Sequence, residues 1–589
     1  MNNVKYLLIP IVLIFLSVSC KKDKDEIFEG VNEQPAATLN LGATLTASFT
    51  GQVLDQSGYP ISGATVQLSN EASSTDENGI FNFKDVAVKE KLAFVKVEKA
   101  GYFSSGRSLI PTASAINHLK LILLEKELTS TIPSGESQSV SLSSGAAVDF
   151  QGKYVTADGS PYEGDVKVYM TYLSPSSTQT QLEMPGMLYA QNSNNEAGVL
   201  TTYGMIGVEL EGDQGQALQI AAESNATIHM PLDPAQTNHS PDEIPLWFFD
   251  DEAGYWIEDG QATLQGGEYV GVVKHFTFWN CDAFNDVTTL SGYTLTANGD
   301  TLANQALQIT AGTMNSSGQT NSDGSYFSYI PSNTLIEFAM IDDCEIPVDV
   351  GSCGPFASGT DNLYDMIIPE TVLEIIIIKG SLVDCVGDPL TNGYVSLLTN
   401  TYSSYGVVTN GSFSIAITNC TSNTNMDLHA YDFDANLQSE VLTYAISAPA
   451  TFVGEIQVCE GGVAITQILS YSIDGNSDIE YTSNIECHEI QNGGNPYFEI
   501  YPQADTSFMV RGWVFDNGQY DFSLLGPTPT IEILPIDIDL TAPHDITVTL
   551  NNYGEINEVV SLNFTGTWTD QSQGLLRTIS GYLVVARDT

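Results

Sequence analysis

Residues 51–83 read GQVLDQSGYPISGATVQLSNEASSTDENGIFNF. Apolar and polar residues alternate in three places, at GQVLD, ATVQL and IFNF, as they do in half-buried strands. Gly58 and Pro60 mark a turn between the first two strands, because glycine adopts positive φ and proline fixes φ. DENG marks a second turn before the third strand. The segment predicts a unit of strand, turn, strand, loop, turn and strand.

The same pattern returns three times along the chain. It reads GKYVTADGSPYEGDVKV at 152–168, GYTLTANGDTLANQALQI at 292–309 and GSLVDCVGDPLTNGYVSL at 380–397. The later copies at 292 and 380 also have the second turn, at NSDGSYF and NGSF. A supersecondary unit that repeats at this spacing predicts several small β-domains in tandem.

This pattern resembles the carboxypeptidase regulatory-like domain, a transthyretin-like β-sandwich. The matching residues are Gly51, Val53, Asp55, Gly58, Pro60, Gly63, Ala64, Val66, Asp76, Gly79 and Phe81. The strand that ends at Gly101-Tyr102 also fits the family. The resemblance implies an accessory module of secreted and surface proteins, and a fold alone does not give an activity. The family name does not imply peptidase activity here, because no histidine begins an H-E-x-x-H or H-x-x-E motif.

The composition suits an all-β, acidic protein. The chain has 50 Gly, 27 Tyr and 24 Phe, and 19 Lys and Arg against 72 Asp and Glu, a formal net charge of −53. Nucleic-acid binding needs a basic surface, so a nucleic-acid partner is disfavoured. The acidity indicates a self-repelling soluble surface, and calcium binding by acidic loops is the sharper alternative. No EF-hand motif is present, residues 76–79 and 323–324 are better explained as turns, and no cofactor is predicted.

The N-terminus predicts export and lipidation. Residues 1–19 contain Lys5 and then an apolar run, residues 7–16, too short for a membrane span of about 20 residues. The small residues SVS before Cys20 resemble a bacterial lipobox, which implies cleavage before Cys20 and acyl groups such as palmitate on the mature Cys20. A strict lipobox has Leu where Ser17 stands. The alternative is an ordinary secretory signal peptide followed by a cysteine by chance.

The charged run KKDKDE after Cys20 resembles the export tag of Bacteroidota surface lipoproteins, and it also suits a solvated tether. The predicted location is therefore the outer membrane, with a lipid anchor and the protein facing the cell exterior. The predicted architecture is a series of Ig-like or transthyretin-like β-sandwiches behind a lipoprotein signal peptide. The predicted segments are a signal peptide 1–19, a lipidated tether 20–45, regulatory-like sandwiches 46–127, 284–374 and 375–460, a less generic β region 128–283 and a C-terminal β-domain 461–589.

The region 128–283 resembles the extracellular regions of the astroprincin and cartilage intermediate layer protein families. More remotely, it resembles the sandwich domain of ankyrins and netrin receptors. Three of the five tryptophans lie here, Trp247, Trp256 and Trp279. Aromatic residues at strand spacing indicate a core more often than a ligand platform.

Seven cysteines follow Cys20, namely Cys281, Cys344, Cys353, Cys385, Cys420, Cys459 and Cys487. Export makes disulfides available. Cys344 and Cys353 are spaced to close a short loop, and three cysteines (385, 420 and 459) fall in one predicted domain. An odd number leaves at least one thiol free or paired between chains. No C-x-x-C is present, which argues against zinc-ribbon or thioredoxin chemistry.

One catalytic hypothesis concerns His275-Phe276-Thr277. This triplet resembles the H-[LF]-[ST] site at which some ankyrin-type and receptor-associated sandwich domains cleave their own backbone. The Thr277 hydroxyl would attack the Phe276 carbonyl in an N→O acyl shift, and His275, on the same face of a strand, would take the proton. The structural alternative is a plain closing strand. Cys487-His488-Glu489 is not a catalytic pair on this reading, because strand neighbours point to opposite faces.

The sequence therefore predicts a non-enzymatic cell-surface lipoprotein whose sandwiches serve as stalk and as binding or adhesion modules, for a glycan or protein ligand. The first alternative is a carbohydrate-binding accessory protein of a polysaccharide-uptake system, which exposed Tyr and Trp platforms would support. The second is a self-cleaving sandwich protein cut between Phe276 and Thr277.

Overall fold

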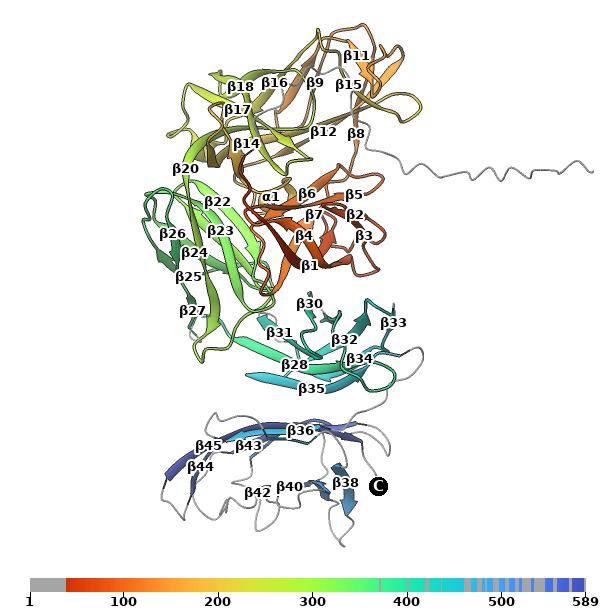
Figure 1. Cartoon of the computed structure of the whole chain (residues 1–589), viewed down its shortest axis with the longest axis vertical. Helices are drawn as coiled ribbons and strands as arrows, with labels where there is room; N and C mark the ends of the chain where they lie inside the picture. Colours follow the sequence, from red (N-terminus) through yellow and green to blue (C-terminus); the bar gives the residue numbers. More distant parts are fainter. Residues whose placement is uncertain are drawn as a thin grey trace, which may run out of the picture.

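The computed structural model describes residues 39–369, 372–399, 402–418, 423–435, 437–459 and short segments between 468 and 586. The predicted signal peptide, Cys20 and most of the predicted tether lie outside these residues. The described chain is nearly all β, in tandem sandwiches, and this confirms the predicted fold class (Figure 1). No helix among the described residues is long and apolar enough to cross a membrane.

The first sandwich is built around the strand that opens the repeated pattern. That strand, β1, lies between β4, to which it is antiparallel, and β7, to which it is parallel. The second sheet has the order β3-β2-β5-β6. Apolar residues of both sheets, such as Phe49, Val66, Phe81 and Val95, are almost fully buried between them. The strands are β1 (Thr44–Leu54), β2 (Thr65–Leu68), β3 (Glu71–Ser74), β4 (Ile80–Lys89), β5 (Ala93–Glu98), β6 (Ser105–Leu109) and β7 (Ile116–Ile122).

The predicted turns form at every copy of the pattern. After each opening strand, one backbone N–H donates to the carbonyl four residues later, in the pairs Asp55–Tyr59, Thr156–Ser160, Thr296–Asp300 and Asp384–Asp388. At the second turn of the first copy, Asp76 Oδ1 accepts from the N–H groups of Asn78 and Ile80, each at 2.9 Å. The turns predicted from the repeated pattern are therefore confirmed.

The third and fourth copies build sandwiches with the topology of the first. In the third, the second half of β20 lies between antiparallel β23 and parallel β26 and β27, and the other sheet is β22-β21-β24-β25. Its strands are β21 (Ala306–Ala311), β22 (Met314–Gln319), β23 (Ser325–Pro331), β24 (Ile336–Ile341), β25 (Pro347–Cys353), β26 (Asp361–Leu363) and β27 (Met366–Ile368).

In the fourth sandwich, β28 lies between antiparallel β31 and parallel β35. The other sheet is β30-β29-β32-β33, with β34 also paired to β32. The strands are β28 (Ile375–Val383), β29 (Gly393–Leu398), β30 (Ser403–Val407), β31 (Ser412–Thr418), β32 (Asn425–Asp432), β33 (Leu437–Gln438), β34 (Leu442–Ala445) and β35 (Ala450–Gln457).

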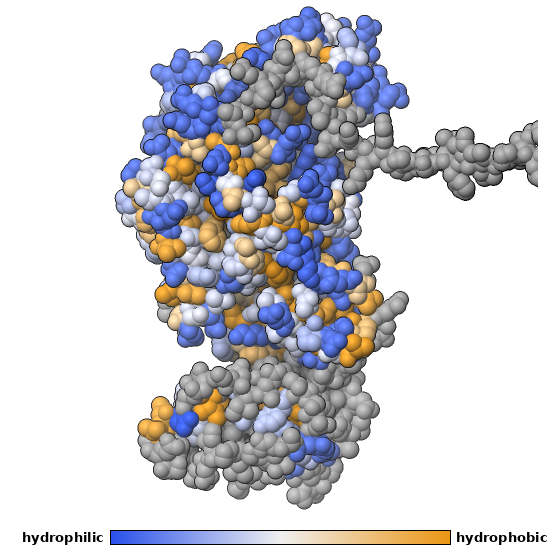
Figure 2. All heavy atoms as spheres, viewed as in Figure 1, coloured by the Kyte–Doolittle hydropathy of each residue, from blue (hydrophilic) through white to orange (hydrophobic). Residues whose placement is uncertain are grey.

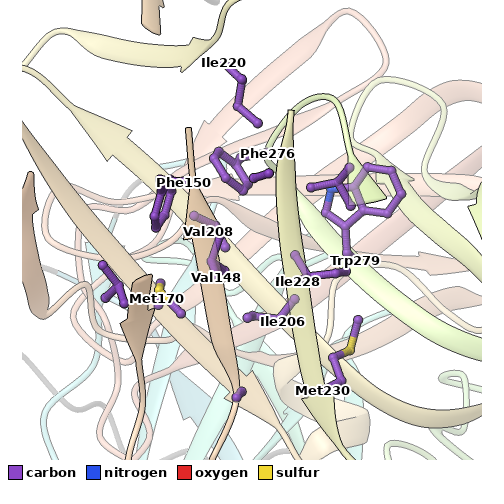
Figure 3. Packing of buried hydrophobic residues seen from close by; sticks show 14 of the residues in the cluster. Val148, Phe150, Met170, Ile206, Val208, Ile220, Ile228, Met230, Phe276 and Trp279 are labelled. Carbon is purple, nitrogen blue, oxygen red and sulfur yellow. The ribbon is translucent and has the colours of Figure 1, made fainter. Parts of the chain in front are cut away.

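The middle region keeps the turn of the second copy but not the sandwich topology. Its opening strand, β11, pairs only with β15, and the region forms one large connected sheet. The elements are β8 (Leu128–Pro133), β9 (Gln138–Ser141), β10 (Ala147–Phe150), β11 (Tyr154–Thr156), β12 (Asp165–Leu173), α1 (Thr180–Glu183), β13 (Tyr189–Gln191), β14 (Ala197–Glu211), β15 (Ala217–Ile220), β16 (Ala226–Pro231), a 3-10 turn (Pro234–Gln236), β17 (Glu243–Asp250), β18 (Tyr255–Gln265), β19 (Glu268–Val273) and β20 (Phe278–Thr296). Figure 3 shows part of its apolar core.

No linker separates the middle region from the third sandwich. The boundary predicted between residues 283 and 284 falls inside the continuous strand β20, which has 19 residues. Residues 278–286 pair with β14 of the middle region, and residues 287–293 pair with β23 of the third sandwich. A shared strand therefore joins the two units without a linker.

The first sandwich is the centre of the assembly rather than the first bead of a string. In Figure 1 it lies below the middle region, beside the third sandwich and above the fourth. Hydrogen bonds reach the middle region from Ser108, the third sandwich from Ile116 and the fourth from Asn82. Figure 2 shows hydrophilic side chains over the outer face of the middle region, as the acidic composition leads us to expect.

The C-terminal domain continues the long axis beyond the fourth sandwich, and β35 contacts β45. The predicted terminal hairpin is present as the antiparallel pair β44 and β45. The strands are β36 (Ile468–Ile473), β37 (Ile479–Tyr481), β38 (Ile485–Ile490), β39 (Tyr497–Pro502), β40 (Phe508–Trp513), β41 (Gly518–Asp521), β42 (Ile531–Ile533), β43 (Thr547–Tyr553), β44 (Val559–Asp570) and β45 (Leu575–Ala586).

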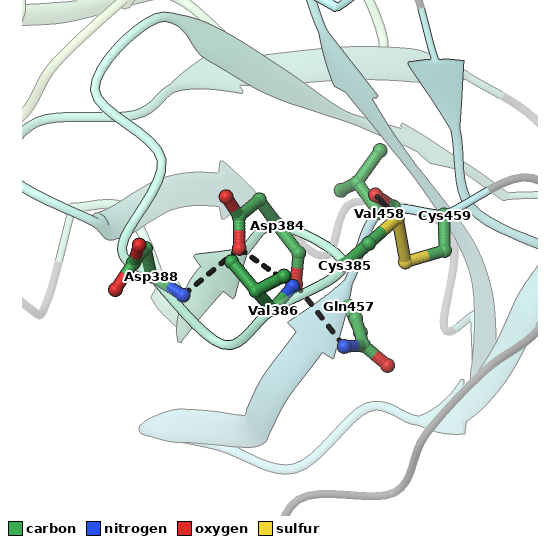
Figure 4. The surroundings of a disulfide bond; sticks show 7 residues. All are labelled: Asp384, Cys385, Val386, Asp388, Gln457, Val458 and Cys459. Carbon is green, nitrogen blue, oxygen red and sulfur yellow. Dashed lines mark hydrogen bonds between the residues drawn. A yellow bond between two sulfur atoms is a disulfide. The ribbon is translucent and has the colours of Figure 1, made fainter.

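The disulfides of the described chain differ from the predicted loop between Cys344 and Cys353. Cys385 and Cys459, 74 residues apart, form a disulfide that ties the start of the fourth sandwich to its end (Figure 4). Cys344 is disulfide-bonded while Cys353 is a free thiol, so the predicted loop between these two is wrong. Cys344 lies in the turn between β24 and β25, whereas Cys353 lies at the far end of β25, opposite Ile336. The two cysteines therefore do not face each other.

Candidate functional site

The predicted self-cleavage triplet does not lie on a strand. His275, Phe276 and Thr277 form the loop between β19 and β20, because β20 begins only at Phe278. The argument that alternate strand residues share a face therefore does not apply to His275 and Thr277. Phe276 points into the core of the middle region, 5.4 Å from the ring of Phe150 (Figure 3).

Groups from strands β15, β17 and β20 hold this loop. The amide of Gln219 brackets Phe276, since its Oε1 accepts from the Phe276 N–H at 2.7 Å and its Nε2 donates to the Phe276 carbonyl at 2.9 Å. The Thr277 hydroxyl donates to the carbonyl of Phe249 at 3.1 Å. The His275 ring packs against Phe248 and Trp279. Among the described residues, no hydrogen bond joins His275 to Thr277.

Burial also makes His275 a poor proton acceptor for the Thr277 hydroxyl. Burial lowers the pKa of His275 to about 4, so the ring is neutral and a weak base at neutral pH. Its Nε2 is buried without a hydrogen-bond partner. The structure thus brings the three residues of the triplet beside Gln219 without coupling the proton acceptor to the nucleophile.

The three tryptophans of the middle region are core residues, as predicted. Trp247, Trp256 and Trp279 are each 0% exposed. Trp247 Nε1 donates to the carbonyl of Asp282 at 2.9 Å, which satisfies its polar group inside the core. None of these three rings is a platform on which a glycan can stack.

A cleft of about 890 Å³ lies between the first and the fourth sandwich. The second turn of the first sandwich forms one wall, with Asp76 and Glu77. Strand β32 and the segment that follows it form the other wall, with Tyr431, Phe433 and Glu440. The cleft is therefore lined by carboxylates, a phenol and a half-buried aromatic ring.

Stacked tyrosines fix the two walls to each other. The rings of Tyr394 and Tyr431 stack at 4.5 Å with an interplanar angle of 2°. The Tyr394 hydroxyl donates to Asp76 Oδ2 at 2.6 Å and accepts from Asn78 Nδ2 at 3.0 Å. Burial raises the pKa of Asp76, and the hydrogen bond from Tyr394 opposes this effect by stabilising the carboxylate.

A second chain of hydrogen bonds starts from Tyr431 in the wall of the cleft. The Tyr431 hydroxyl lies 3.0 Å from Glu77 Oε1 and 2.7 Å from His429 Nδ1. His429 Nε2 donates to the carbonyl of Ser439 at 2.6 Å, which orients the imidazole. The walls are thereby held by hydrogen bonds between residues more than 300 positions apart.

The edge of the cleft is closed by amides. Asn82 Nδ2 donates to Asn392 Oδ1 at 2.9 Å, and Asn392 Nδ2 donates to Asp434 Oδ1 at 2.5 Å. Lys84 lies 3.8 Å from Asp434 at the exposed rim. Sequence reasoning assigned residues 76–79 correctly to a turn but missed the cleft, because nothing in one repeat shows which other repeat it contacts.

No group of three or more His, Cys, Asp or Glu side chains within the described ranges is arranged to hold a metal ion. In the described part of β38, Cys487 is buried and His488 pairs instead with Glu486, Nε2 to Oε2 at 3.0 Å. The alternation along the strand separates Cys487 from His488, as predicted.

Comparison with known proteins gives one similarity at the level of sequence. No family model matches the chain. The chain is 26% identical to cartilage intermediate layer protein 2 of Mus musculus over 226 residues, which are 36% of this chain and 19% of that protein. Cartilage intermediate layer protein 1 of Mus musculus is 26% identical over 211 residues, 33% of this chain and 17% of that protein. The chain spans about a fifth of the length of these relatives, and the similarity supports the predicted resemblance of the middle region.

Solved structures give only distant likenesses. The Bacillus anthracis TIE protein has a TM-score of 0.14 and 9% identity, and the match covers 67% of this chain and 71% of that one. BcpA, the major pilin subunit of Bacillus cereus, has a TM-score of 0.12 and 9% identity, with 70% and 99% covered. Scores this low carry no argument about this chain.

Proposed function

We propose that the protein is a non-enzymatic cell-surface lipoprotein, anchored in the outer membrane through Cys20, whose sandwiches form a binding or adhesion module. The observation that supports this most is the cleft of about 890 Å³ between the first and fourth sandwiches. Its walls are fixed by Tyr394 and Tyr431, so the cleft is preorganised and a ligand does not have to order it on binding.

Binding rather than turnover fits the geometry of the one predicted catalytic motif. His275 and Thr277 share no hydrogen bond, and the Thr277 hydroxyl is engaged by the carbonyl of Phe249. We therefore assign no reaction to this loop and treat it as the closing segment of the middle-region core.

Glycan capture is the second candidate, and the lining of the cleft favours it. Sugars are bound by carboxylates and amides that accept and donate hydrogen bonds to hydroxyl groups, beside an aromatic ring that covers an apolar face of the sugar. Glu77, Asn392 and Phe433 provide these three kinds of group in one cleft. The buried tryptophans of the middle region count against a glycan platform there.

A glycan and protein-ligand array tests the proposal. The lipid-free chain from residue 21 onward is screened as wild type, as Phe433→Ala, and as Tyr59→Ala, whose ring is 69% exposed at a turn outside the cleft. Loss of the bound ligand in Phe433→Ala, with Tyr59→Ala unchanged, supports the cleft. Binding that survives Phe433→Ala and Glu77→Gln refutes it.

The anchor has its own test. Cells that express the full chain are labelled with a clickable palmitate analogue, with Cys20→Ser as the control. Label in the wild type that disappears in the variant supports lipidation at Cys20, and equal label in both excludes it.

A further inference from the structure

A second, smaller cavity of about 90 Å³ lies where three units meet. It is bounded by β6 and β7 of the first sandwich, by the residues around α1 of the middle region, and by β22 of the third sandwich. Three basic side chains line it, Arg107, His118 and Lys120, and none of its lining residues in the described chain is Asp or Glu. Such a lining is unusual in a chain with 19 Lys and Arg against 72 Asp and Glu.

Arg107 is buried without a counter-charge. Arg107 is only 5% exposed. Its guanidinium donates to the backbone carbonyls of Gln181 and Ser317, the latter at 2.5 Å. No carboxylate in the described chain pairs with it. Burial lowers the pKa of Arg107 to about 10, so the group remains charged at neutral pH. A buried charge of this kind calls for an ion of opposite sign, because desolvation is otherwise uncompensated.

Two further lining residues have an unpartnered polar atom. His118 Nε2 and Ser317 Oγ are buried and have no hydrogen-bond partner. His118 Nδ1 lies 3.3 Å from the hydroxyl of Tyr405, and when that hydroxyl donates to Nδ1 the proton of the neutral ring is on Nε2. Both unpartnered groups are then hydrogen-bond donors, as an anion requires.

Lys120 plays a smaller part. It is half-buried, and burial lowers its pKa while Glu345 and Asp343 of the third sandwich raise it. Its charge is therefore already partly compensated from outside the cavity. Arg107 is left as the principal unneutralised charge.

We propose that this cavity binds one small oxyanion of the size and charge of sulfate or phosphate, held by the Arg107 guanidinium and by the donors of His118 and Ser317. A volume of about 90 Å³ exceeds the share of a single water, about 30 Å³ in the liquid, and suits one polyatomic anion. The planar fork of arginine matches the oxygen spacing of such anions. The anion joins the first sandwich to the third, because Arg107 and Ser317 come from different units.

Equilibrium dialysis of the purified lipid-free chain from residue 21 onward against ³⁵S-sulfate, and separately against ³²P-phosphate, tests the site at constant ionic strength. The expected result is saturation at one anion per chain, with at least a tenfold weaker binding in Arg107→Met and a severalfold weaker binding in Ser317→Ala. Ser317→Ala leaves the backbone acceptor of Arg107 in place, so it remains informative even when Arg107→Met does not fold.

Lys153→Met is the matched control, because this exposed lysine lies 3.8 Å from Glu223 and is not one of the residues that line the cavity. Unchanged binding in Lys153→Met supports the assignment to the cavity. Saturation below a tenth of an anion per chain for both ions means that water alone fills the cavity and overturns the proposal. Equal binding in the wild type, Arg107→Met and Ser317→Ala places the anion elsewhere and overturns it as well.

Discussion

Replacing Asp282 by Asn should stabilise the protein, and more so at high pH than at low pH. Asp282 lies on β20 in the middle of the core and is 0% exposed. Asn280 Nδ2 donates to its Oδ2 at 2.9 Å, and no basic side chain of the described residues pairs with it. Burial raises the pKa of Asp282 to about 7, because the desolvated carboxylate favours its neutral form.

The magnitude follows from linkage between proton binding and folding. The folded chain holds this proton more tightly than the unfolded chain, whose pKa is near the usual 3.8. Stability is therefore lost as the pH rises from about 4 to about 7 and is constant above that. At 1.36 kcal/mol per pKa unit, keeping Asp282 buried costs about 4 kcal/mol at pH 8, where its carboxylate is charged, and about 1.5 kcal/mol at pH 5, where the folded chain must bind a proton that the unfolded chain has released. The gain from Asp282→Asn should be about 2.5 kcal/mol larger at pH 8 than at pH 5.

Urea unfolding at the two pH values, followed by tryptophan fluorescence, measures this difference. The probe is local, since Trp247 donates to the backbone carbonyl of Asp282. Asp286→Asn is the matched control, since Asp286 is on the same strand but exposed, so this substitution removes no buried carboxylate. A gain that is equal at pH 5 and pH 8, or larger at pH 5, refutes the reasoning.

Three further predictions concern the other parts of the molecule. Tyr394→Phe removes the hydrogen bond to Asp76 and should cost about 1.5–3 kcal/mol, seen as faster hydrogen exchange of residues 76–80 with the remaining core unaffected. Cys385→Ala opens a loop of 74 residues and should lower the unfolding free energy of the fourth sandwich by about 4 kcal/mol, measured by urea unfolding of the variant and the wild type without reductant; an unchanged unfolding midpoint would contradict this. Thr277→Ala should give a single intact mass, as should the wild type, because His275 does not reach the hydroxyl; two fragments meeting at Phe276 and Thr277 in the wild type alone would show that the loop cleaves itself.

The parts of the fold that were predictable from sequence are those set by short-range chemistry. The turn after each opening strand needs only Gly, Pro or Asp at fixed positions, and the bonds from Asp55 and from Asp384 form alike although 329 residues separate them. The burial of Trp247 agrees with the expectation that aromatic residues at strand spacing form a core. These features depend on neighbours within a few residues, so the sequence contains all that is needed to predict them.

The parts that were not predictable depend on which units meet. The cleft joins Glu77 to Tyr431, and one repeat contains no signal for its partner in another. The loop at His275 looked like a strand because its alternation continues into β20, yet Gln219 holds the backbone of Phe276 with two hydrogen bonds and ends the regular pairing there. Tertiary contacts override local pattern at such positions.

Charge explains why the first sandwich becomes the centre. Eight of the 19 Lys and Arg residues of the chain fall between residues 46 and 127. Lys126 lies 2.8 Å from Glu209 and 2.7 Å from Glu211 of the middle region, and its pKa is raised because the two carboxylates more than offset its burial.

The other units supply the opposite charges. Lys96 reaches Asp251 of the middle region at 3.2 Å, and Lys84 reaches Asp434 of the fourth sandwich at 3.8 Å. Exposed pairs contribute little alone, but the first sandwich has 8 Lys and Arg against 9 Asp and Glu, and a nearly neutral unit among acidic ones also reduces the self-repulsion of a chain with net charge −53. The first sandwich therefore holds acidic neighbours that repel one another, and high salt should weaken these rim contacts while leaving the buried contact between Tyr394 and Asp76 in place.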